Sequence, residues 1–108
     1  MPTTLPSVTA VMPARDDAEH IDAAIASVLE QDYAGQLDLV VALGPSDDGT
    51  GAVLERHATD ARVQVVPNPT GGTAAGLNLA ISQATGSVIV RVDAHCELPA
   101  RYVDRAVR

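Results

Sequence analysis

The chain has 108 residues, 46% of them hydrophobic and only 2% aromatic. One domain, or a part of one, can therefore form around a core of valine, leucine, isoleucine and alanine. The formal net charge is −7, and all seven basic residues are arginines. This balance argues against nucleic acid and an anionic membrane surface as partners, because both favour a basic face. A small phosphorylated ligand would need local positive charge from a cation or from helix ends.

Cys96 is the single cysteine, so no disulfide can form within the chain, and this favours a reducing compartment. The first residues lack the basic segment and long apolar run of a signal peptide. No apolar stretch reaches the roughly 18–20 residues of a membrane span. We therefore expect a cytoplasmic protein without a transmembrane segment, for which the inner face of the membrane is a compatible location.

Hydrophobic patterning predicts strands and helices that alternate after a Pro- and Thr-rich lead-in over 1–6, which we expect to be mobile. Short apolar runs indicate strands, and apolar residues three and four positions apart indicate helices. The strands are expected over 7–12, 37–43, 62–66 and 87–92, and Pro13 is expected to end the first of them. The helices are expected over about 17–31, 50–58 and 73–84, with a fourth that begins near Pro99.

This β-α-β-α-β-α-β order predicts an α/β fold with a mostly parallel sheet and helices on both faces. Ligands of such sheets bind beyond the carboxyl ends of the strands, near the point where the strand order reverses. Three polar segments are therefore expected at one rim: PARDD at 13–17, GPSDDGT at 44–50 and DAHCE at 93–97.

The last of these segments offers two metal-capable side chains, Asp93 and His95, which can point to the same side of the chain. Mn²⁺ accepts imidazole beside carboxylate, whereas Mg²⁺ prefers oxygen. Phosphate oxygens and water would complete the site, and Cys96 is a third candidate ligand. The alternative is that Asp93 caps a turn, His95 is solvated and Cys96 fills the core.

The segment after the first strand offers Arg15 as a phosphate contact and Asp17 as an acceptor for a ribose or a base. The alternative is that Asp16 or Asp17 caps the next helix and Arg15 is solvated. Glycines at 44–50 and 68–78 lie beside helix starts, which can receive phosphates. They match neither the Lys-containing phosphate loop nor G-x-G-x-x-G.

Several segments together resemble family 2 glycosyltransferases, over nearly the whole chain from Ser7 to Val103. VTAVMPARDDAEHIDAAIASVLEQDY resembles the opening strand, turn and helix of that family, and LDLVVALGPSDDGT resembles its second strand and turn. NPTGGTAAGLNLAISQATGSVIVRVDAHCELPARYV resembles its third helix, fourth strand and metal motif. The chain most resembles bacterial polysaccharide-assembly enzymes of the succinoglycan type.

The resemblance implies a GT-A fold, of which 7–108 would be the Rossmann-like, nucleotide-sugar-binding half, truncated before the acceptor half. It implies inverting transfer of a sugar from a nucleotide diphosphate sugar to a glycan or lipid-linked acceptor. The family's Asp-X-Asp metal motif falls on Asp93-Ala94-His95. The His variant is also similar to the Asp-X-His motif of mucin-type N-acetylgalactosaminyltransferases, so we expect Mn²⁺ ahead of Mg²⁺.

The resemblance also implies which residues contact the nucleotide sugar. These are Pro13, Ala14, Arg15 and Asp17 in the first loop, Asn78 in the third helix, and Asp93.

One pair of residues departs from the family pattern. The family has an acidic pair after the second strand, with one Asp that reads the uracil edge, whereas this chain has Ala42-Leu43. Asp47 and Asp48 follow later and have the character of turn and cap residues. The identity of the base, and UDP as the donor nucleotide, are therefore not implied.

We expect the general base of the transfer to lie outside this chain, so that the chain alone does not turn over. Only 13 residues follow His95. Of the carboxylates there, Glu97 is too near the metal motif and Asp104 is expected on a helix directed away from an acceptor. The last strand would have an unpaired apolar edge that can pair with another chain, which predicts a possible homo-oligomer.

Three other functions compete with the transferase. The first is a nucleotide-sugar-binding half-domain without activity of its own. The second is a receiver-like signalling domain, which also has an acidic pair such as Asp16-Asp17 after its first strand. Receiver domains need a phospho-acceptor Asp after the third strand and a later Lys, whereas PNPTGG follows here and the chain has no Lys. A nucleotidyltransferase would need a glycine-rich, basic first loop, which is missing.

Overall fold

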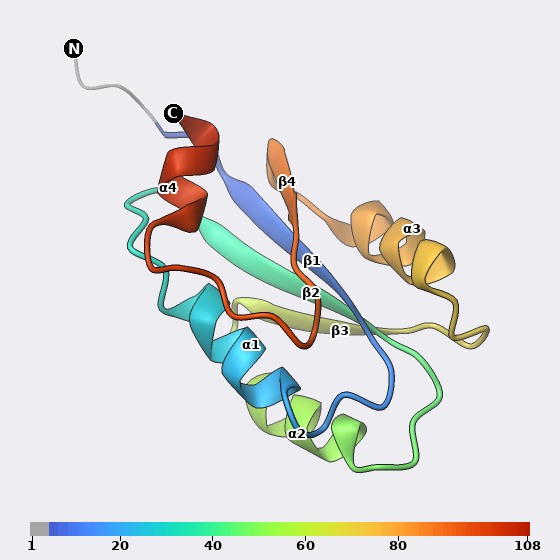
Figure 1. Ribbon diagram of the computed structural model, residues 1–108. Helices are drawn as coiled ribbons and strands as arrows, with labels where there is room; N and C mark the ends of the chain where they lie inside the picture. Colours follow the sequence, from blue (N-terminus) through green and yellow to red (C-terminus); the bar gives the residue numbers. More distant parts are fainter. Residues whose placement is uncertain (1–4) are drawn as a thin grey trace.

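The structure, a computed structural model, describes residues 5–108, in which four strands and four helices alternate (Figure 1). The strands are β1 (Val8–Ala14), β2 (Leu37–Leu43), β3 (Val63–Pro67) and β4 (Val88–Arg91). The helices are α1 (Ile21–Leu29), α2 (Thr50–His57), α3 (Thr73–Gln83) and α4 (Tyr102–Val107). The order of elements expected from the sequence is confirmed. Of the expected lead-in, residues 1–4 lie outside the described part of the chain.

All strand pairs in the sheet are parallel, and the strand order is β3-β2-β1-β4. β1 pairs with β2 from Val8↔Leu37 onward and with β4 from Val8↔Val88 onward. The chain builds outward from β1 through β2 to β3 and then returns to the other side of β1 to form β4. The strand order therefore reverses between β1 and β4, and this is where an α/β sheet of this kind opens a crevice at its carboxyl end.

Helices cover both faces of the sheet, as expected. Figure 1 shows α3 on one side and α1 and α2 on the other. Alternate residues of β1 divide between two aliphatic clusters, because successive side chains of a strand point to opposite faces. Met12 belongs to the larger cluster with Ile25 of α1, and Val11 belongs to the smaller one with Ala80 of α3. Among residues 5–108, every helix is too short or too polar to cross a bilayer.

β1 continues through Pro13 to Ala14, so the expectation that Pro13 ends this strand is wrong. The Ala14 carbonyl accepts a hydrogen bond from Gly44 on the β2 side, whereas the Val11 carbonyl accepts one from Val92 on the β4 side. Because successive residues of a strand direct their backbone groups to alternate sides, the Pro13 nitrogen points toward β4. That strand has already ended at Arg91. The missing N–H costs no ladder hydrogen bond, which is the condition for Pro within a strand.

α1 begins at Ile21, four residues later than the expected start at 17. The N–H groups of His20 and Ile21 both donate to the Asp17 carbonyl, so the preceding residues form a turn. Asp16 has a φ of 50°, a left-handed conformation that ends any helical path here. The N-cap residue is His20, without a side-chain cap bond, so neither Asp16 nor Asp17 caps this helix.

The turn after β1 is instead fastened to the loop after β2 by hydrogen bonds between side chains and backbone N–H groups. These run from the Asp16 N–H to Ser46 Oγ (2.9 Å), from the Asp17 N–H to Thr50 Oγ1 (2.9 Å), from the Ala18 N–H to Asp48 Oδ2 (3.1 Å) and from the Asp47 N–H to Asp16 Oδ1 (3.0 Å). Asp48 Oδ1 also accepts from the Thr50 N–H and hydroxyl, which confirms Asp48 as a turn residue. The two loops therefore behave as one unit.

Gly86 should tolerate no side chain. A Cβ there would lie 2.6 Å from the Thr9 nitrogen, and the Gly86 N–H donates to Thr9 Oγ1 at 2.9 Å. Because the obstacle is backbone, Gly86→Ala should lower the free energy of unfolding by about 1–3 kcal/mol in urea titrations. Gly72→Ala is the matched control, since nothing lies within 4 Å of its Cβ position. Equal stability of the two variants would contradict this packing.

Asp48→Asn should lower the thermal midpoint near neutral pH, because an amide offers one oxygen where the carboxylate accepts at both. The hydrogen bond from the Thr50 hydroxyl is the main cause that holds the pKa of Asp48 below its ordinary value of 3.8. The contribution of the ionised Asp48 to the stability of the fold is therefore complete above its ordinary pKa of 3.8, and it is lost as the pH falls through the lowered pKa of the folded chain.

Circular dichroism melts from about pH 7 to about pH 3 would check this, because the gap between the native chain and Asp48→Asn should close in acid. Asp47→Asn removes the same charge from the same loop without the Thr50 and Ala18 contacts, and should melt like the native chain. A gap that stays constant down to the lowest pH would contradict the assignment.

Candidate functional site

A pocket of about 520 Å³ opens at the carboxyl ends of β1 and β4, where the strand order reverses. Three segments line it: Pro13, Ala14, Arg15 and Asp17 after β1; Asn68, Gly71, Gly72 and Thr73 before α3; and Arg91, Asp93, Ala94 and His95 at the end of β4. Six of the seven residues expected to bind metal or nucleotide sugar are thus brought together. A cavity of about 510 Å³ at the opposite end of the strands contains none of them.

Arg15 and Asp17 form one wall of the pocket. The Arg15 N–H donates to Asp17 Oδ2 at 3.0 Å, which closes a tight turn directly after β1. The Arg15 side chain is exposed and crosses the loop at Gly71, where an added Cβ would lie 2.9 Å from Nη1. Gly71 has a φ of 73°, a left-handed conformation that favours glycine, and a side chain there would also displace the Arg15 guanidinium.

Asn68 shapes the second wall from within. Its side chain is 3% exposed, and its Nδ2 donates to the Gly72 carbonyl at 3.0 Å while Oδ1 accepts from the Thr70 hydroxyl at 3.2 Å. These bonds fold the loop back so that Gly71 and Gly72 face the pocket. Sequence reasoning considered the glycines of this segment and did not single out Asn68; its position at the carboxyl end of β3 was the available signal.

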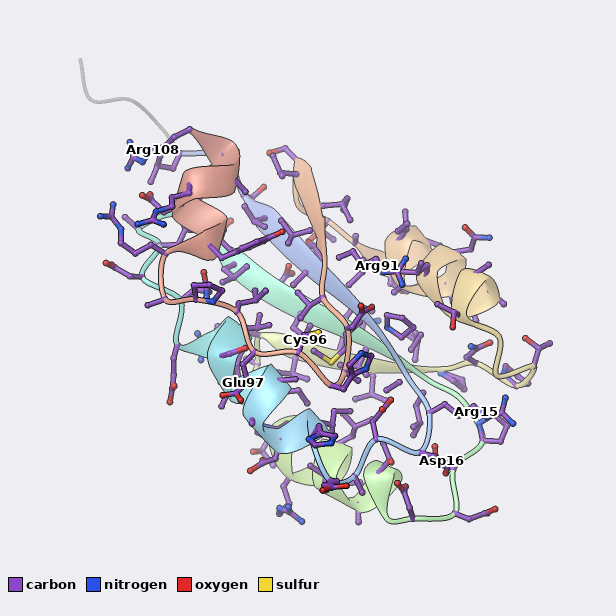
Figure 2. The ribbon with its side chains drawn as sticks, viewed as in Figure 1. Arg15, Asp16, Arg91, Cys96, Glu97 and Arg108 are labelled. Carbon is purple, nitrogen blue, oxygen red and sulfur yellow. The ribbon has the colours of Figure 1, made fainter. Side chains whose placement is uncertain are left out.

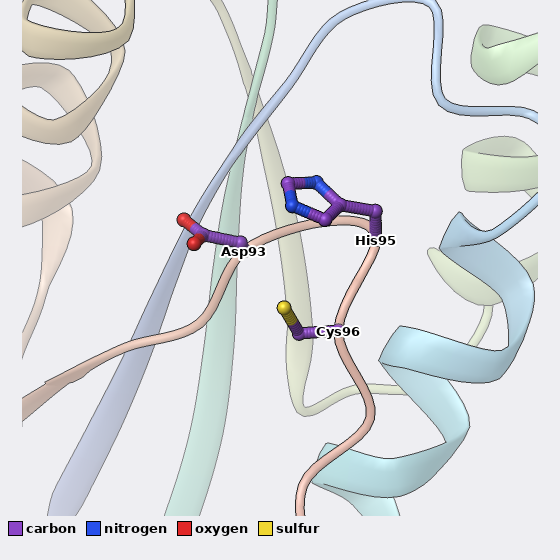
Figure 3. A group of neighbouring side chains, drawn as sticks. All are labelled: Asp93, His95 and Cys96. Carbon is purple, nitrogen blue, oxygen red and sulfur yellow. The ribbon is translucent and has the colours of Figure 1, made fainter.

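Asp93, His95 and Cys96 project from the turn that follows β4, and in this view the His95 ring reaches back toward Asp93 (Figure 3). Their candidate ligand atoms lie within 4.8 Å of one another. Two ligands held at about 2.0–2.3 Å from one cation are at most about 4.6 Å apart, so small side-chain rotations would bring these atoms to a shared ion. The donor set of carboxylate, imidazole and thiolate fits a divalent transition metal.

The turn itself decides against two of the three alternatives weighed from the sequence, those for Cys96 and Asp93, and agrees with the exposed His95 of the third. Cys96 is exposed, so it does not fill the core. The Cys96 N–H donates to the main-chain carbonyl of Asp93 at 3.0 Å, so the turn is closed by backbone and the Asp93 carboxylate is not consumed as a cap. His95 is exposed and Asp93 half-buried, which leaves the outer side of the cluster accessible to further ligands.

Arg91 is a lining residue that sequence reasoning missed. Its Nε and Nη2 each lie 3.2 Å from Asp93 Oδ1. The signal was the spacing, because residues two apart at a strand end can share a face of the sheet.

The remaining candidates lie away from the pocket. Asn78 is exposed on α3 and does not line the cavity, so its role stays a prediction. Ala42 is buried and Leu43 half-buried in the two aliphatic clusters, where they offer no polar atom. Asp104 accepts from Arg101 and Arg108 at 2.8 and 3.0 Å, and Glu97 is exposed.

Comparison with curated proteins identifies a succinoglycan biosynthesis protein and a glycosyltransferase as relatives. Succinoglycan biosynthesis protein ExoA of Rhizobium meliloti (strain 1021) is 34% identical over 100 residues, which cover 90% of this chain and 30% of that protein. Glycosyltransferase AglE of Haloferax volcanii is 26% identical over 110 residues, or 99% of this chain and 36% of that protein. The chain thus spans about a third of the length of these relatives.

Solved structures share the fold. Mannosyltransferase PcManGT from Pyrobaculum calidifontis superposes with a TM-score of 0.81 at 34% identity, over 92% of this chain and 30% of that one. S. aureus TarS superposes with a TM-score of 0.83 at 21% identity, over 93% of this chain and 18% of that one. These neighbours have the GT-A glycosyltransferase fold, and the described sheet and helices correspond to its Rossmann-like part.

The sequence profile described as Glycosyl transferase family 2 matches residues 9–108, which is nearly the whole chain. The match includes the first loop, the loop before α3 and the Asp93-Ala94-His95 turn that together line the pocket. The chain therefore belongs to glycosyltransferase family 2.

Proposed function

We propose that this chain binds a nucleotide diphosphate sugar and provides the donor side of an inverting, metal-assisted transfer to a glycan or lipid-linked acceptor. The observation that supports this most is the convergence of Arg15 and Asp17 with Asp93 and His95 on one pocket at the sheet's reversal point. The mannosyltransferase with 34% identity was solved with GDP-Man and Mn²⁺, and TarS with UDP and with UDP-GlcNAc.

Local positive charge is needed to hold a diphosphate in a chain whose net charge is −7. Arg15 and Arg91 are the two arginines on the pocket lining. α3 begins at Thr73 on the same lining, so the positive end of its dipole adds to the potential there. Guanidinium groups suit this role because they bind phosphate oxygens in a bidentate manner and stay charged at all relevant pH values.

Asp93 and His95 would hold the divalent cation, with Cys96 as an accessible third ligand. When bound, the cation supplies Lewis-acid charge that neutralises a departing diphosphate. The imidazole favours Mn²⁺ over Mg²⁺, because Mg²⁺ strongly prefers oxygen ligands. Few protein ligands make a weak site, so we expect tight metal binding only when phosphate oxygens complete the coordination.

A binding half-domain without catalysis is the second candidate. Among residues 5–108, the carboxylates on the pocket lining are Asp17 and Asp93. Asp17 accepts from the Arg15 N–H and Asp93 is assigned to the metal, so the lining offers no further carboxylate as a general base. Nucleotide release from activated sugars, with and without acceptors, separates the two candidates. The receiver-like alternative is excluded by the family to which the chain belongs.

Mn²⁺-dependent binding of nucleoside diphosphates should depend on Asp93. We expect Asp93→Ala to weaken the binding of UDP and GDP at saturating Mn²⁺ at least tenfold in calorimetric titrations, because it removes the one carboxylate of the metal cluster. His95→Asp should retain binding and narrow the preference for Mn²⁺ over Mg²⁺, since it replaces nitrogen with oxygen. Glu55→Ala, on the exposed face of α2, is the matched control. Undiminished binding by Asp93→Ala would refute the assignment.

Discrimination among bases should be poor. A buried carboxylate placed for one base penalises the others by leaving polar groups unpaired. Ala42 and Leu43 pack in the aliphatic clusters and supply no such group at the end of β2. We expect UDP, GDP and ADP to bind within about a hundredfold of one another, or about 2.8 kcal/mol at about 1.4 kcal/mol per tenfold. Competition titrations with Mn²⁺ would measure this, and a larger preference for any one base would contradict it.

A further inference from the structure

Arg91 and Asp93 form an ion pair inside the pocket that is proposed to bind metal and diphosphate. Both contacts from the guanidinium, at 3.2 Å, end on the same carboxylate oxygen, Asp93 Oδ1. The side chains are 54% and 39% exposed. The pair therefore occupies one of the two oxygens that Asp93 offers to a cation, and a guanidinium and a metal ion compete for the negative charge of this carboxylate.

The geometry of the Arg91–Asp93 ion pair is that of a weak pair. Strong arginine–carboxylate pairs are bidentate across both oxygens at about 2.7–2.9 Å, whereas this one is longer and uses a single oxygen. Pairs that are half-exposed contribute little to stability because water screens them. A divalent ion carries twice the charge and is also bound by His95, so it should displace Arg91 readily.

Once displaced, Arg91 remains on the lining of the same pocket. Arg91 is the last residue of β4 and Arg15 directly follows the last residue of β1, so the two arginines, both labelled in Figure 2, lie at the ends of the two strands that flank the reversal point. The lining carries two arginines, Arg15 and Arg91, and two aspartates, Asp17 and Asp93. A cation that neutralises Asp93 leaves Arg91 without a counter-charge, and a diphosphate restores the balance.

We propose that Arg91 is a positioning residue that exchanges partners when the site is loaded. Before loading it holds the Asp93 carboxylate at the end of β4, and when a divalent cation takes that carboxylate, its guanidinium donates to the phosphates of the donor. This inference rests on the proposed function of the pocket. It makes metal and nucleotide binding cooperative, and the coupling must be reciprocal: each ligand strengthens binding of the other by the same factor.

The exchange predicts opposite effects on two affinities. Arg91→Gln should bind Mn²⁺ alone about fivefold more tightly, equivalent to about 1 kcal/mol at about 1.4 kcal/mol per tenfold, because its competitor is gone. The same variant should bind UDP and GDP at saturating Mn²⁺ at least tenfold more weakly, because a charge-assisted phosphate contact is lost. Arg91→Lys should lie between, since it keeps the charge but not the planar fork. A merely structural role would move both affinities in one direction.

The measurements are calorimetric titrations of the 108-residue chain with Mn²⁺ alone, and with UDP or GDP at saturating Mn²⁺. Arg56→Gln removes the same charge from the exposed face of α2 and should change neither affinity. Arg15→Gln should weaken nucleotide binding without the gain for Mn²⁺ alone, because the side-chain ion pair of Asp93 is with Arg91 and not with Arg15. Because Arg91 is exposed on β4, its substitution should leave the fold intact. Thermal melts of each variant verify folding.

The outcomes separate the exchange from the function on which it rests. Opposite shifts for Arg91→Gln support the exchange. Unchanged or weaker binding of Mn²⁺ alone, or unchanged nucleotide affinity, overturns the exchange while the proposed function stands. If the unmodified chain binds no nucleoside diphosphate with Mn²⁺, the proposed function fails, and the exchange fails with it.

Discussion

The site depends on the hydrogen bonding of β1 to strands on both of its sides. β1 pairs with β2 along its full length, but with β4 only from Val8↔Val88 to Val11↔Arg91. The last residues of β1 therefore project beyond β4 with one side unpaired. That step in the sheet is the pocket floor, because it leaves Pro13 and Ala14 open to the turn that bears Asp93 and His95. Pro13 suits this place, since its nitrogen needs no partner.

Around this step, the two sides of the pocket differ in how many hydrogen bonds hold them in place. The loops after β1 and β2 are fastened together by the Asp16, Asp48 and Thr50 hydrogen bonds, and Asn68 pins the loop before α3. The turn after β4 has one backbone hydrogen bond and a half-exposed ion pair. Under the proposed function, the more firmly held wall would receive the nucleotide, and the turn after β4 would receive the cation.

The fold was predictable because its signals are local. Apolar runs marked all four strands and helical spacing marked the helices, since burial against a sheet imposes these periods on the sequence. The errors occurred where a distant contact overrides a local signal. Pro13 continues β1 because β4 stops early, and α1 starts late because Thr50 and Asp48 hold the residues before it. Cys96 is exposed, because its turn lies at the rim and not in the core.

The sequence by itself determined the alternation of elements, the family and the residue types at the site, because each of these depends on residues that are close together in the chain. Asp93 and His95 lie two positions apart, and Arg15 and Asp17 likewise. Only the tertiary structure decided that Asn68 and Gly71 share their pocket, that Asn78 does not, and that Arg91 holds the Asp93 carboxylate. Such facts depend on how far each strand extends beside its neighbour, and that extent is set by hydrogen bonds between segments far apart in the chain.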